Sequence, residues 1–215
     1  MIHLLSSGFW DFTADLASRD TAYTSLALRA HTDTTYFTDP CGLQMFHLLS
    51  HTEGSGGASL LVDGFAAANQ LKKEAPEAYE TLSRVRVPTH ASGNEDISIQ
   101  PTVTFPVLNH HPQTGELEQV RWNNDDRATM DQWESETELE EWYDAARKWS
   151  EILRREENEY WEQLRPGRPM SLYSLENYHC LIGMADDREP QSLITGESYM
   201  AGQPLPAKDV CVAVT

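Results

Sequence analysis

The sequence has few cysteines and no long apolar run among its 215 residues. Cys41, Cys180 and Cys211 are too few and too scattered for a disulfide framework or a zinc ribbon, which favours a reducing, intracellular compartment. No stretch approaches the about 20 apolar residues of a membrane-spanning helix. The N-terminal segment MIHLLSSGFW has no basic region and no signal or transit character. We therefore expect no membrane partner and a cytoplasmic location, or a mitochondrial one if the true N-terminus lies upstream.

Basic residues are also scarce. The chain carries 16 Lys and Arg against 34 Asp and Glu, a formal net charge of −18. Because nucleic-acid binding depends on neutralising phosphates with basic side chains, this balance argues against a nucleic-acid partner. An acidic surface can attract a cationic ligand but does not identify one. The length is sufficient for one domain with a substantial core.

Short β-like runs dominate the first two thirds of the chain, and helical patterns occur in two places. The first helical region is broken at Pro76, which predicts two short helices. The second runs from about Glu136 to Leu164, and the segment RPGRP (165–169) is predicted to end it. Its apolar residues recur at three- and four-residue steps, which predicts a core-facing stripe. The members of this stripe are Leu139, Trp142, Tyr143, Ala146, Trp149, Ile152 and Leu153. This mixture predicts an α+β, β-rich domain.

The segment RAHTDTTYF (29–37) combines β-branched and aromatic residues, which favour an extended strand. In a strand, His31 and Asp33 would point to the same face and lie side by side. One interpretation is an ordinary polar strand face. The other is a non-haem Fe(II) site, which uses two histidines and one carboxylate on one side of the metal. The third ligand would then be a distant histidine. The candidates are His47, His51, His90, His110, His111 and His179.

Three longer segments carry a family resemblance: residues 20–65, the run VRWNNDDRA (120–128) and the run LRREENEYWEQLRPGRP (153–169). Together they resemble trimethyllysine dioxygenase, one of the Fe(II)- and 2-oxoglutarate-dependent oxygenases, a family that also includes gamma-butyrobetaine dioxygenase. The resemblance covers about residues 9–169. It implies a double-stranded β-helix, or jelly roll, with iron in its mouth, here incomplete at both ends.

The resemblance implies roles for particular residues. His31 and Asp33 match two iron ligands, and Ser59 matches a residue that hydrogen-bonds the 2-oxoglutarate carboxylate, although an ordinary turn serine is the alternative.

Trp10 and Tyr23 match two walls of an aromatic cage for a trimethylammonium group, which has no N–H to donate. Plain core packing is the alternative for both. Asp20 and Asn123, with Asn124 as a neighbour, match positions that hold the polar end of the substrate. Asp20 suits a free α-amino group, and relatives that act on gamma-butyrobetaine carry an amide there, which favours trimethyllysine.

The activity implied is hydroxylation of N6,N6,N6-trimethyl-L-lysine at C3, the first step of carnitine biosynthesis. Fe(II), the co-substrate 2-oxoglutarate, O₂ and ascorbate would be required, and a homodimer is compatible with the sequence. Two alternatives stay open. One is a catalytically impaired fragment with too few iron ligands. The other is hydroxylation of gamma-butyrobetaine or another small molecule on the same scaffold.

Both ends depart from the family pattern. Ser6 stands where relatives place a Tyr of the cage. Beyond Met170 the sequence has no clean period, and the family's last iron-binding His and 2-oxoglutarate-binding Arg are not seen. Read one frame over, the codons from Ser192 onward permit the missing family segment, which predicts a frameshift or a retained intron. His179 is a weak replacement for the missing ligand. We expect a partial oxygenase domain over residues 1–170 and an anomalous tail over residues 171–215.

Overall fold

The structure is a computed structural model that describes seven segments of the chain. These are residues 8–13, 27–40, 43–51, 57–91, 98–173, 180–184 and 208–214.

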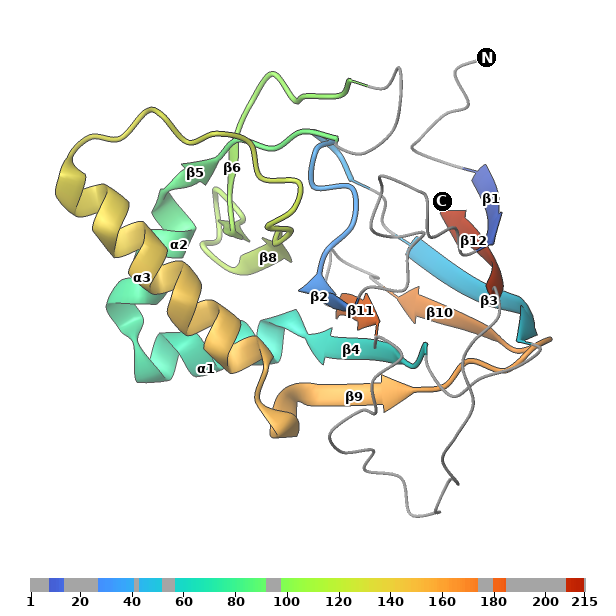
Figure 1. The fold of residues 1–215 in the computed structure, drawn as a ribbon. Helices are drawn as coiled ribbons and strands as arrows, with labels where there is room; N and C mark the ends of the chain where they lie inside the picture. Colours follow the sequence, from blue (N-terminus) through green and yellow to red (C-terminus); the bar gives the residue numbers. More distant parts are fainter. Residues whose placement is uncertain are drawn as a thin grey trace.

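The described fold contains two four-stranded antiparallel sheets (Figure 1). The first sheet has the strand order β1 (Gly8–Thr13), β12 (Lys208–Val214), β3 (Leu43–His51) and β10 (Pro169–Tyr173). The second has the order β2 (Leu28–His31), β11 (Cys180–Met184), β4 (Ser59–Asp63) and β9 (Glu159–Glu162). Two small hairpin-like pairs join β5 (Arg86–Val87) to β6 (Phe105–Pro106), and β7 (Leu108–His110) to β8 (Leu117–Val120). The mixture of strands and helices is the α+β, β-rich class that the sequence predicts.

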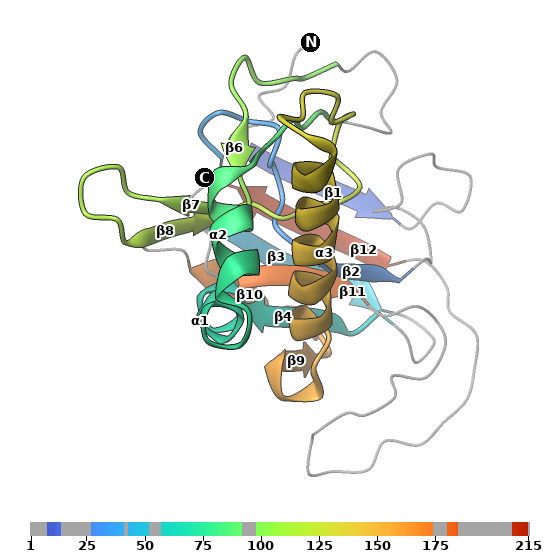
Figure 2. The same cartoon turned by 90° about the vertical axis from the view of Figure 1, so that its left-hand side faces the viewer.

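Three helices lie on one side of these sheets (Figure 1) and stand in front of the strands when the molecule is turned (Figure 2). They are α1 (Gly64–Glu74), α2 (Pro76–Arg84) and α3 (Glu136–Leu153). Pro76 occupies the first turn of α2, where its missing N–H costs nothing, so the predicted break between two short helices is confirmed. Asp63 caps α1 by accepting hydrogen bonds from two backbone N–H groups in its first turn.

The helix α3 ends earlier than the sequence predicts. It stops at Leu153 and is followed by a short 3₁₀ helix (Glu156–Asn158) and by β9, rather than continuing to the segment RPGRP. The reason is competition from the sheet: Tyr160 and Trp161 pair with β4, and Asn158 donates a hydrogen bond to the carbonyl of Ile152 at the helix end.

Most of the predicted apolar stripe of α3 faces the core. Trp142 and Trp149 are 1% and 0% exposed, and Ala146, Ile152 and Leu153 are also buried. Leu139 and Tyr143, however, are 37% and 47% exposed, so the prediction was wrong for these two. The core cluster joins α3 to the two other helices and to the second sheet through residues such as Leu71, Leu82, Leu60 and Leu181.

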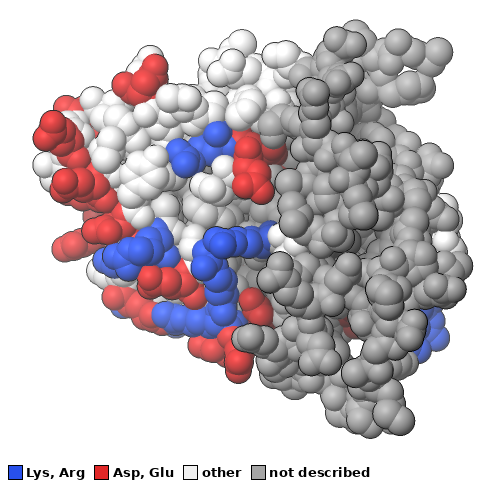
Figure 3. All heavy atoms as spheres, in the orientation of Figure 1, with Lys and Arg blue, Asp and Glu red and all other residues white. Residues whose placement is uncertain are grey.

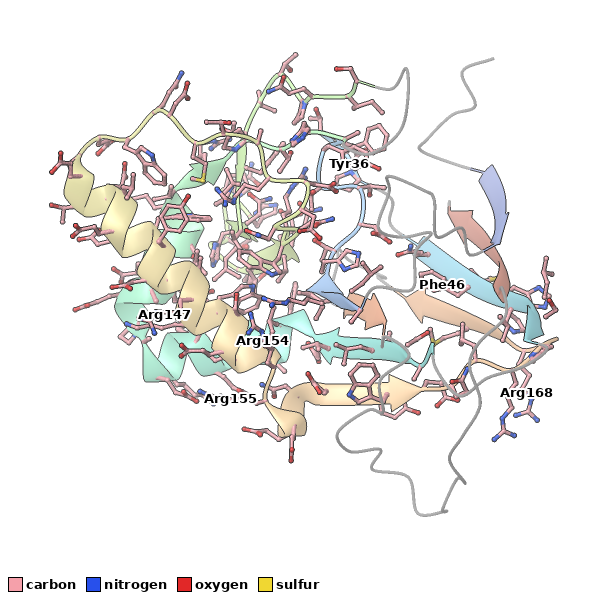
Figure 4. The ribbon with its side chains drawn as sticks, in the orientation of Figure 1. Tyr36, Phe46, Arg147, Arg154, Arg155 and Arg168 are labelled. Atoms are coloured by element: carbon pink, nitrogen blue, oxygen red, sulfur yellow. The ribbon has the colours of Figure 1, made fainter. Side chains whose placement is uncertain are left out.

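The outer face of α3 is charged. Acidic side chains line this edge of the molecule, with arginines toward the C-terminal end of the helix (Figure 3). Arg147 forms ion pairs with Asp144 and Glu151 one turn on either side, and Figure 4 shows Arg154 and Arg155 beyond it. Such exposed pairs are the pattern of a solvated helix face. No helix in the described part of the chain is long and apolar enough to cross a membrane.

Strands from beyond residue 170 pair with strands from the predicted domain. β10 crosses that boundary, β11 lies between β2 and β4, and β12 lies between β1 and β3. The separate origin of residues 171–215 stays a prediction, because pairing of strands does not test the reading frame.

Candidate metal centre

The strand that carries the H-x-D motif is shorter than the sequence predicts. The strand β2 ends at His31, and the following residues form a turn instead of continuing as a strand to Phe37. Thr32 leaves the sheet ladder because its backbone N–H donates to the carbonyl of Trp122, at 2.7 Å. The threonines and aromatics that favoured a strand therefore lie in a turn.

His31 and Asp33 nevertheless lie side by side, as the motif predicts. The Nε2 atom of His31 is 3.1 Å from Oδ1 of Asp33. Their side chains are 19% and 36% exposed, so both are partly sheltered but open to a ligand. Two donors of the type that non-haem iron prefers thus face one another at the end of β2.

Neighbouring groups orient both side chains. Nδ1 of His31 donates to the carbonyl of Arg29 at 2.7 Å, which fixes the ring and leaves Nε2 as the atom available to a metal. Gln44, on β3, donates from Nε2 to Oδ2 of Asp33 at 2.5 Å. The centre therefore lies where the end of β2 meets a strand of the other sheet.

The two groups strongly perturb each other's protonation. Burial alone would lower the pKa of His31, but the hydrogen bond to Asp33 and the charge of that carboxylate raise it to about 9, with contributions from the hydrogen bond to the Arg29 carbonyl and from the charge of Asp126. Burial would raise the pKa of Asp33, but the hydrogen bond and charge of His31 and the hydrogen bond from Gln44 lower it. Without a metal, the protonated His31 ring donates from Nε2 to the Asp33 carboxylate. A metal ion that bound both side chains would have to displace this proton.

The residues present suit Fe(II) in donor type, with one imidazole and one carboxylate within contact of each other. They do not form a complete set: within the described segments, no group of three or more His, Cys, Asp or Glu side chains could hold a metal ion. Two of the histidines proposed as a third ligand have other partners, whereas the Nδ1 atom of His90 is buried and has no hydrogen-bond partner among the described residues. His110 binds the Tyr79 hydroxyl at 2.8 Å, His111 accepts from two backbone N–H groups of its own turn, and His47 lies within β3. The side chain of His51 and all of His179 lie outside the described residues.

The turn after the motif is strained. Thr34, the residue after Asp33, has a φ of 56°, a left-handed conformation that β-branched residues rarely adopt. Such a conformation costs about 1 to 3 kcal/mol and persists only where surrounding contacts impose it. The turn is closed by the N–H of Phe37, which donates to the carbonyl of Thr34 at 3.0 Å. Figure 4 shows Tyr36 on this loop beyond β2.

Asn123 lies next to the motif. Its neighbour Trp122 is bonded to Thr32 in both directions, since the Trp122 N–H donates to Oγ1 of Thr32 at 2.8 Å. The Asn123 side chain donates to Asp126 at 2.8 Å and accepts from the N–H of Asp125 at 3.1 Å, which shapes the loop 123–126. Asn123 thus directly follows a residue that is hydrogen-bonded to Thr32, the residue between the two candidate metal ligands.

For the other predicted site residues, the structure gives a position in a strand or no description at all. Ser59 begins β4 and is half-buried, in the same sheet as β2; it pairs with Met184, which pairs with Leu28, so it lies toward the opposite end of β2 from His31. The backbone of Trp10 lies in β1 opposite Val212, and its side chain is not described. Ser6, Asp20 and Tyr23 lie outside the described residues.

Two residues that contact the motif were not expected from the sequence. Gln44 supports Asp33 directly, and Arg121 reaches the turn after it. No local sequence pattern predicts these two contacts, because Gln44 and Arg121 reach the motif only when their own segments fold against it.

Comparison with known proteins adds a family and a fold. The model of the family "Taurine catabolism dioxygenase TauD, TfdA family" matches residues 6–170. The trimethyllysine dioxygenase of Neurospora crassa is 52% identical over 82% of this chain and 43% of its own length. The mitochondrial trimethyllysine dioxygenase of Homo sapiens is 43% identical over 94% of this chain and 45% of its own, and human gamma-butyrobetaine dioxygenase is 27% identical. The chain spans about half the length of these relatives.

Solved structures confirm the predicted fold. An asparagine oxygenase aligns with a TM-score of 0.62 over 95% of this chain and 56% of its own, at 12% identity. A taurine dioxygenase from Burkholderia xenovorans aligns with a TM-score of 0.60 over 96% of this chain and 63% of its own, at 14% identity. The described sheets are therefore those of a jelly roll of the 2-oxoglutarate oxygenase type.

Proposed function

The chain belongs to the TauD, TfdA family of dioxygenases, and on that premise we propose that it forms part of an Fe(II)- and 2-oxoglutarate-dependent dioxygenase acting on N6,N6,N6-trimethyl-L-lysine. The observation that carries the proposal is the contact of His31 Nε2 with Asp33 Oδ1 at 3.1 Å, in a chain that is 52% identical to a trimethyllysine dioxygenase. The reaction is hydroxylation at C3, the first step toward carnitine.

Iron and 2-oxoglutarate would supply oxygen activation, with oxidative decarboxylation of 2-oxoglutarate to succinate and insertion of one oxygen atom into the C3–H bond. The chain supplies the rest. Nε2 of His31, once it releases its proton, and the carboxylate of Asp33 would hold the metal. The carbonyl of Arg29 and the amide of Gln44 keep those two ligands in orientation. The partly sheltered setting of both ligands limits the access of water to the reacting groups.

Substrate and co-substrate are proposed to contact the residues that the family resemblance identifies. Ser59 would donate to the carboxylate of 2-oxoglutarate. Trp10 and Tyr23 would enclose the trimethylammonium group, since aromatic faces attract a cation that has no N–H. Asp20 would pair with the α-amino group and Asn123 would hold the carboxylate end. The Asn123 amide carries two N–H donors and uses one of them on Asp126, so its second remains suited to an acceptor.

Turnover assays decide whether trimethyllysine or gamma-butyrobetaine is the substrate. The 215-residue chain would be incubated anaerobically with Fe(II), ascorbate and 2-oxoglutarate, exposed to air with either trimethyllysine or gamma-butyrobetaine, and assayed for succinate and for hydroxylated product by mass spectrometry. We expect product from trimethyllysine, none from Asp33→Ala, and wild-type rates from His111→Ala, which removes an imidazole whose hydrogen bonds lie within its own turn. Preference for gamma-butyrobetaine would overturn the substrate assignment.

One observation favours a second candidate function. Because the described residues supply two metal ligands rather than three, the chain could bind Fe(II) weakly and release no succinate. The same assay decides between the two: weak Fe(II) binding without succinate release would establish the non-catalytic candidate, and succinate formed in step with hydroxylated product would exclude it.

The remaining expectations belong to the same proposal. Ascorbate would keep the iron ferrous, and omission of ascorbate would shorten the linear phase of the assay. We propose a location in mitochondria, as the name of the human relative states for that protein, and a homodimer without nucleic-acid or membrane partners. Fractionation of cells and light scattering of the purified protein test these points.

A further inference from the structure

A buried arginine next to the candidate metal centre has no part in the function proposed above. Arg121 follows β8 directly and is 7% exposed. A buried guanidinium is costly to desolvate, and it persists in proteins where its donors are satisfied. Its planar face lies over the ring of Phe105, with 4.1 Å between the guanidinium carbon and the ring centroid.

The guanidinium binds the backbone of the turn that follows Asp33. Its Nη2 atom donates to the carbonyl of Thr35 at 2.7 Å and to that of Phe37 at 2.5 Å, while Nη1 donates to Gln119 at 3.2 Å. The carbonyl of Thr35 also accepts from the hydroxyl of Thr89 at 3.0 Å. The turn is therefore held from outside at two of its carbonyls.

The same short segment also holds the chain on the other side of Asp33. Trp122, the next residue after Arg121, exchanges hydrogen bonds with Thr32. Arg121 is itself anchored to the core, because its backbone N–H donates to the carbonyl of the buried Val107 at 2.8 Å. Asp33 is thus bracketed by two consecutive residues of one anchored segment.

The hydrogen bonds from Arg121 and Trp122 explain how the strained turn persists. Thr34 has a left-handed φ of 56°, and it lies between Asp33 and the two carbonyls that Arg121 binds. Released from those bonds, the turn would relax toward a right-handed conformation, and the backbone that carries the Asp33 side chain would rotate with it.

We propose that Arg121 is a positioning residue of the metal centre, which holds Thr34 in its strained conformation and thereby fixes the Asp33 carboxylate against His31 and Gln44. The inference rests on the proposed function for its metal, but the placement of Asp33 can be measured without one. Nη2 binds both carbonyls while Nη1 binds Gln119 and the planar face lies on Phe105. The ammonium of lysine has neither the second nitrogen nor the planar face, so it cannot reproduce this placement.

The test uses Arg121→Lys with Arg86→Lys as its matched control. Arg86 also lies over the Phe105 ring, at 6.0 Å, but it is exposed and donates to the carbonyl of Thr104, away from the motif. The first readout needs no metal: it is the NMR signal of the Gln44 side-chain amide, which donates to Asp33 and can be assigned by its loss in Gln44→Met. We expect Arg121→Lys to shift this signal in the direction that Asp33→Asn shifts it, and Arg86→Lys to leave it unchanged.

The second readout is anaerobic Fe(II) affinity, which we expect to fall about 10- to 100-fold in Arg121→Lys, as for other residues that orient a ligand. A third variant, Thr34→Asn, tolerates the left-handed conformation better and should restore part of the lost affinity when combined with Arg121→Lys. If Arg121→Lys fails to fold, Thr89→Val removes one bond from the same carbonyl and should shift the Gln44 signal in the same direction to a smaller extent.

An unchanged Gln44 signal in a folded Arg121 or Thr89 variant would overturn the inference, even if the variant is less stable, because it would show a purely structural arginine. If wild-type protein binds no Fe(II), the proposed function fails on that count, while the Gln44 signal still decides the role of Arg121.

Discussion

The contact of His31 with Asp33 makes a specific prediction for stability against pH in metal-free protein. Burial alone would lower the pKa of His31, but the hydrogen bond and charge of Asp33, helped by the Arg29 carbonyl and the charge of Asp126, raise it from 6.5 to about 9. One pKa unit corresponds to about 1.4 kcal/mol, so this shift as a whole contributes about 3 kcal/mol to the free energy of unfolding. Because the pKa is raised in the folded state, this contribution is fully present below the unfolded pKa of 6.5 and is lost as the pH rises through about 9.

Asp33→Asn removes the two largest causes of the upward shift, and burial, which lowers the pKa of His31, then favours the neutral imidazole. We therefore expect the stability advantage of wild type over the variant to be about 3 kcal/mol larger near pH 6 than near pH 9.5. Urea unfolding in the presence of EDTA at both pH values measures it, and taking the difference cancels every other group that titrates. A difference that is the same at both pH values would refute the assigned interaction.

Three further predictions concern the co-substrate, a helix cap and the core. Ser59→Ala should weaken 2-oxoglutarate binding about 10- to 100-fold, the effect of one hydrogen bond to a charged group. Unchanged affinity in a titration of the Fe(II)-loaded protein would remove Ser59 from the site. Asp63→Ala should cost about 1 kcal/mol of stability by removing the N-cap of α1, as a shift of the urea midpoint, whereas Asp63→Asn should cost little. Trp149→Ala should cost about 3 to 5 kcal/mol, because Trp149 is 0% exposed. The control Tyr160→Ala, at a residue 58% exposed, should stay within about 0.5 kcal/mol, and equal losses for the two would contradict the described core.

Local pattern accounts for much of the fold. The recurrence of Trp142 and Trp149 at helical spacing predicts their burial, and Pro76 predicts the break between two helices. Pattern does not say which neighbours cover a stripe, so Tyr143, at the edge of it, is exposed. Nor does it show that Tyr160 pairs with a strand about a hundred positions earlier in the chain, which ends the helix before the predicted point.

The candidate metal centre was also predictable from the sequence only in part. The spacing of His31 and Asp33 predicts that they lie together, and they do, although a turn rather than a strand brings them there. Gln44 and Arg121 reach the motif across 11 and 86 residues of chain. Contacts of that kind depend on how sheets and loops pack, and no single local pattern encodes them.

The central claim is that His31 and Asp33 hold one ferrous ion. Anaerobic titration of the purified chain with Fe(II), followed calorimetrically, tests it most directly when wild type is compared with His31→Ala, Asp33→Ala and His111→Ala. We expect one ion per chain in wild type and in His111→Ala, and loss of that binding in the other two variants. Equal binding by all four proteins would contradict the account.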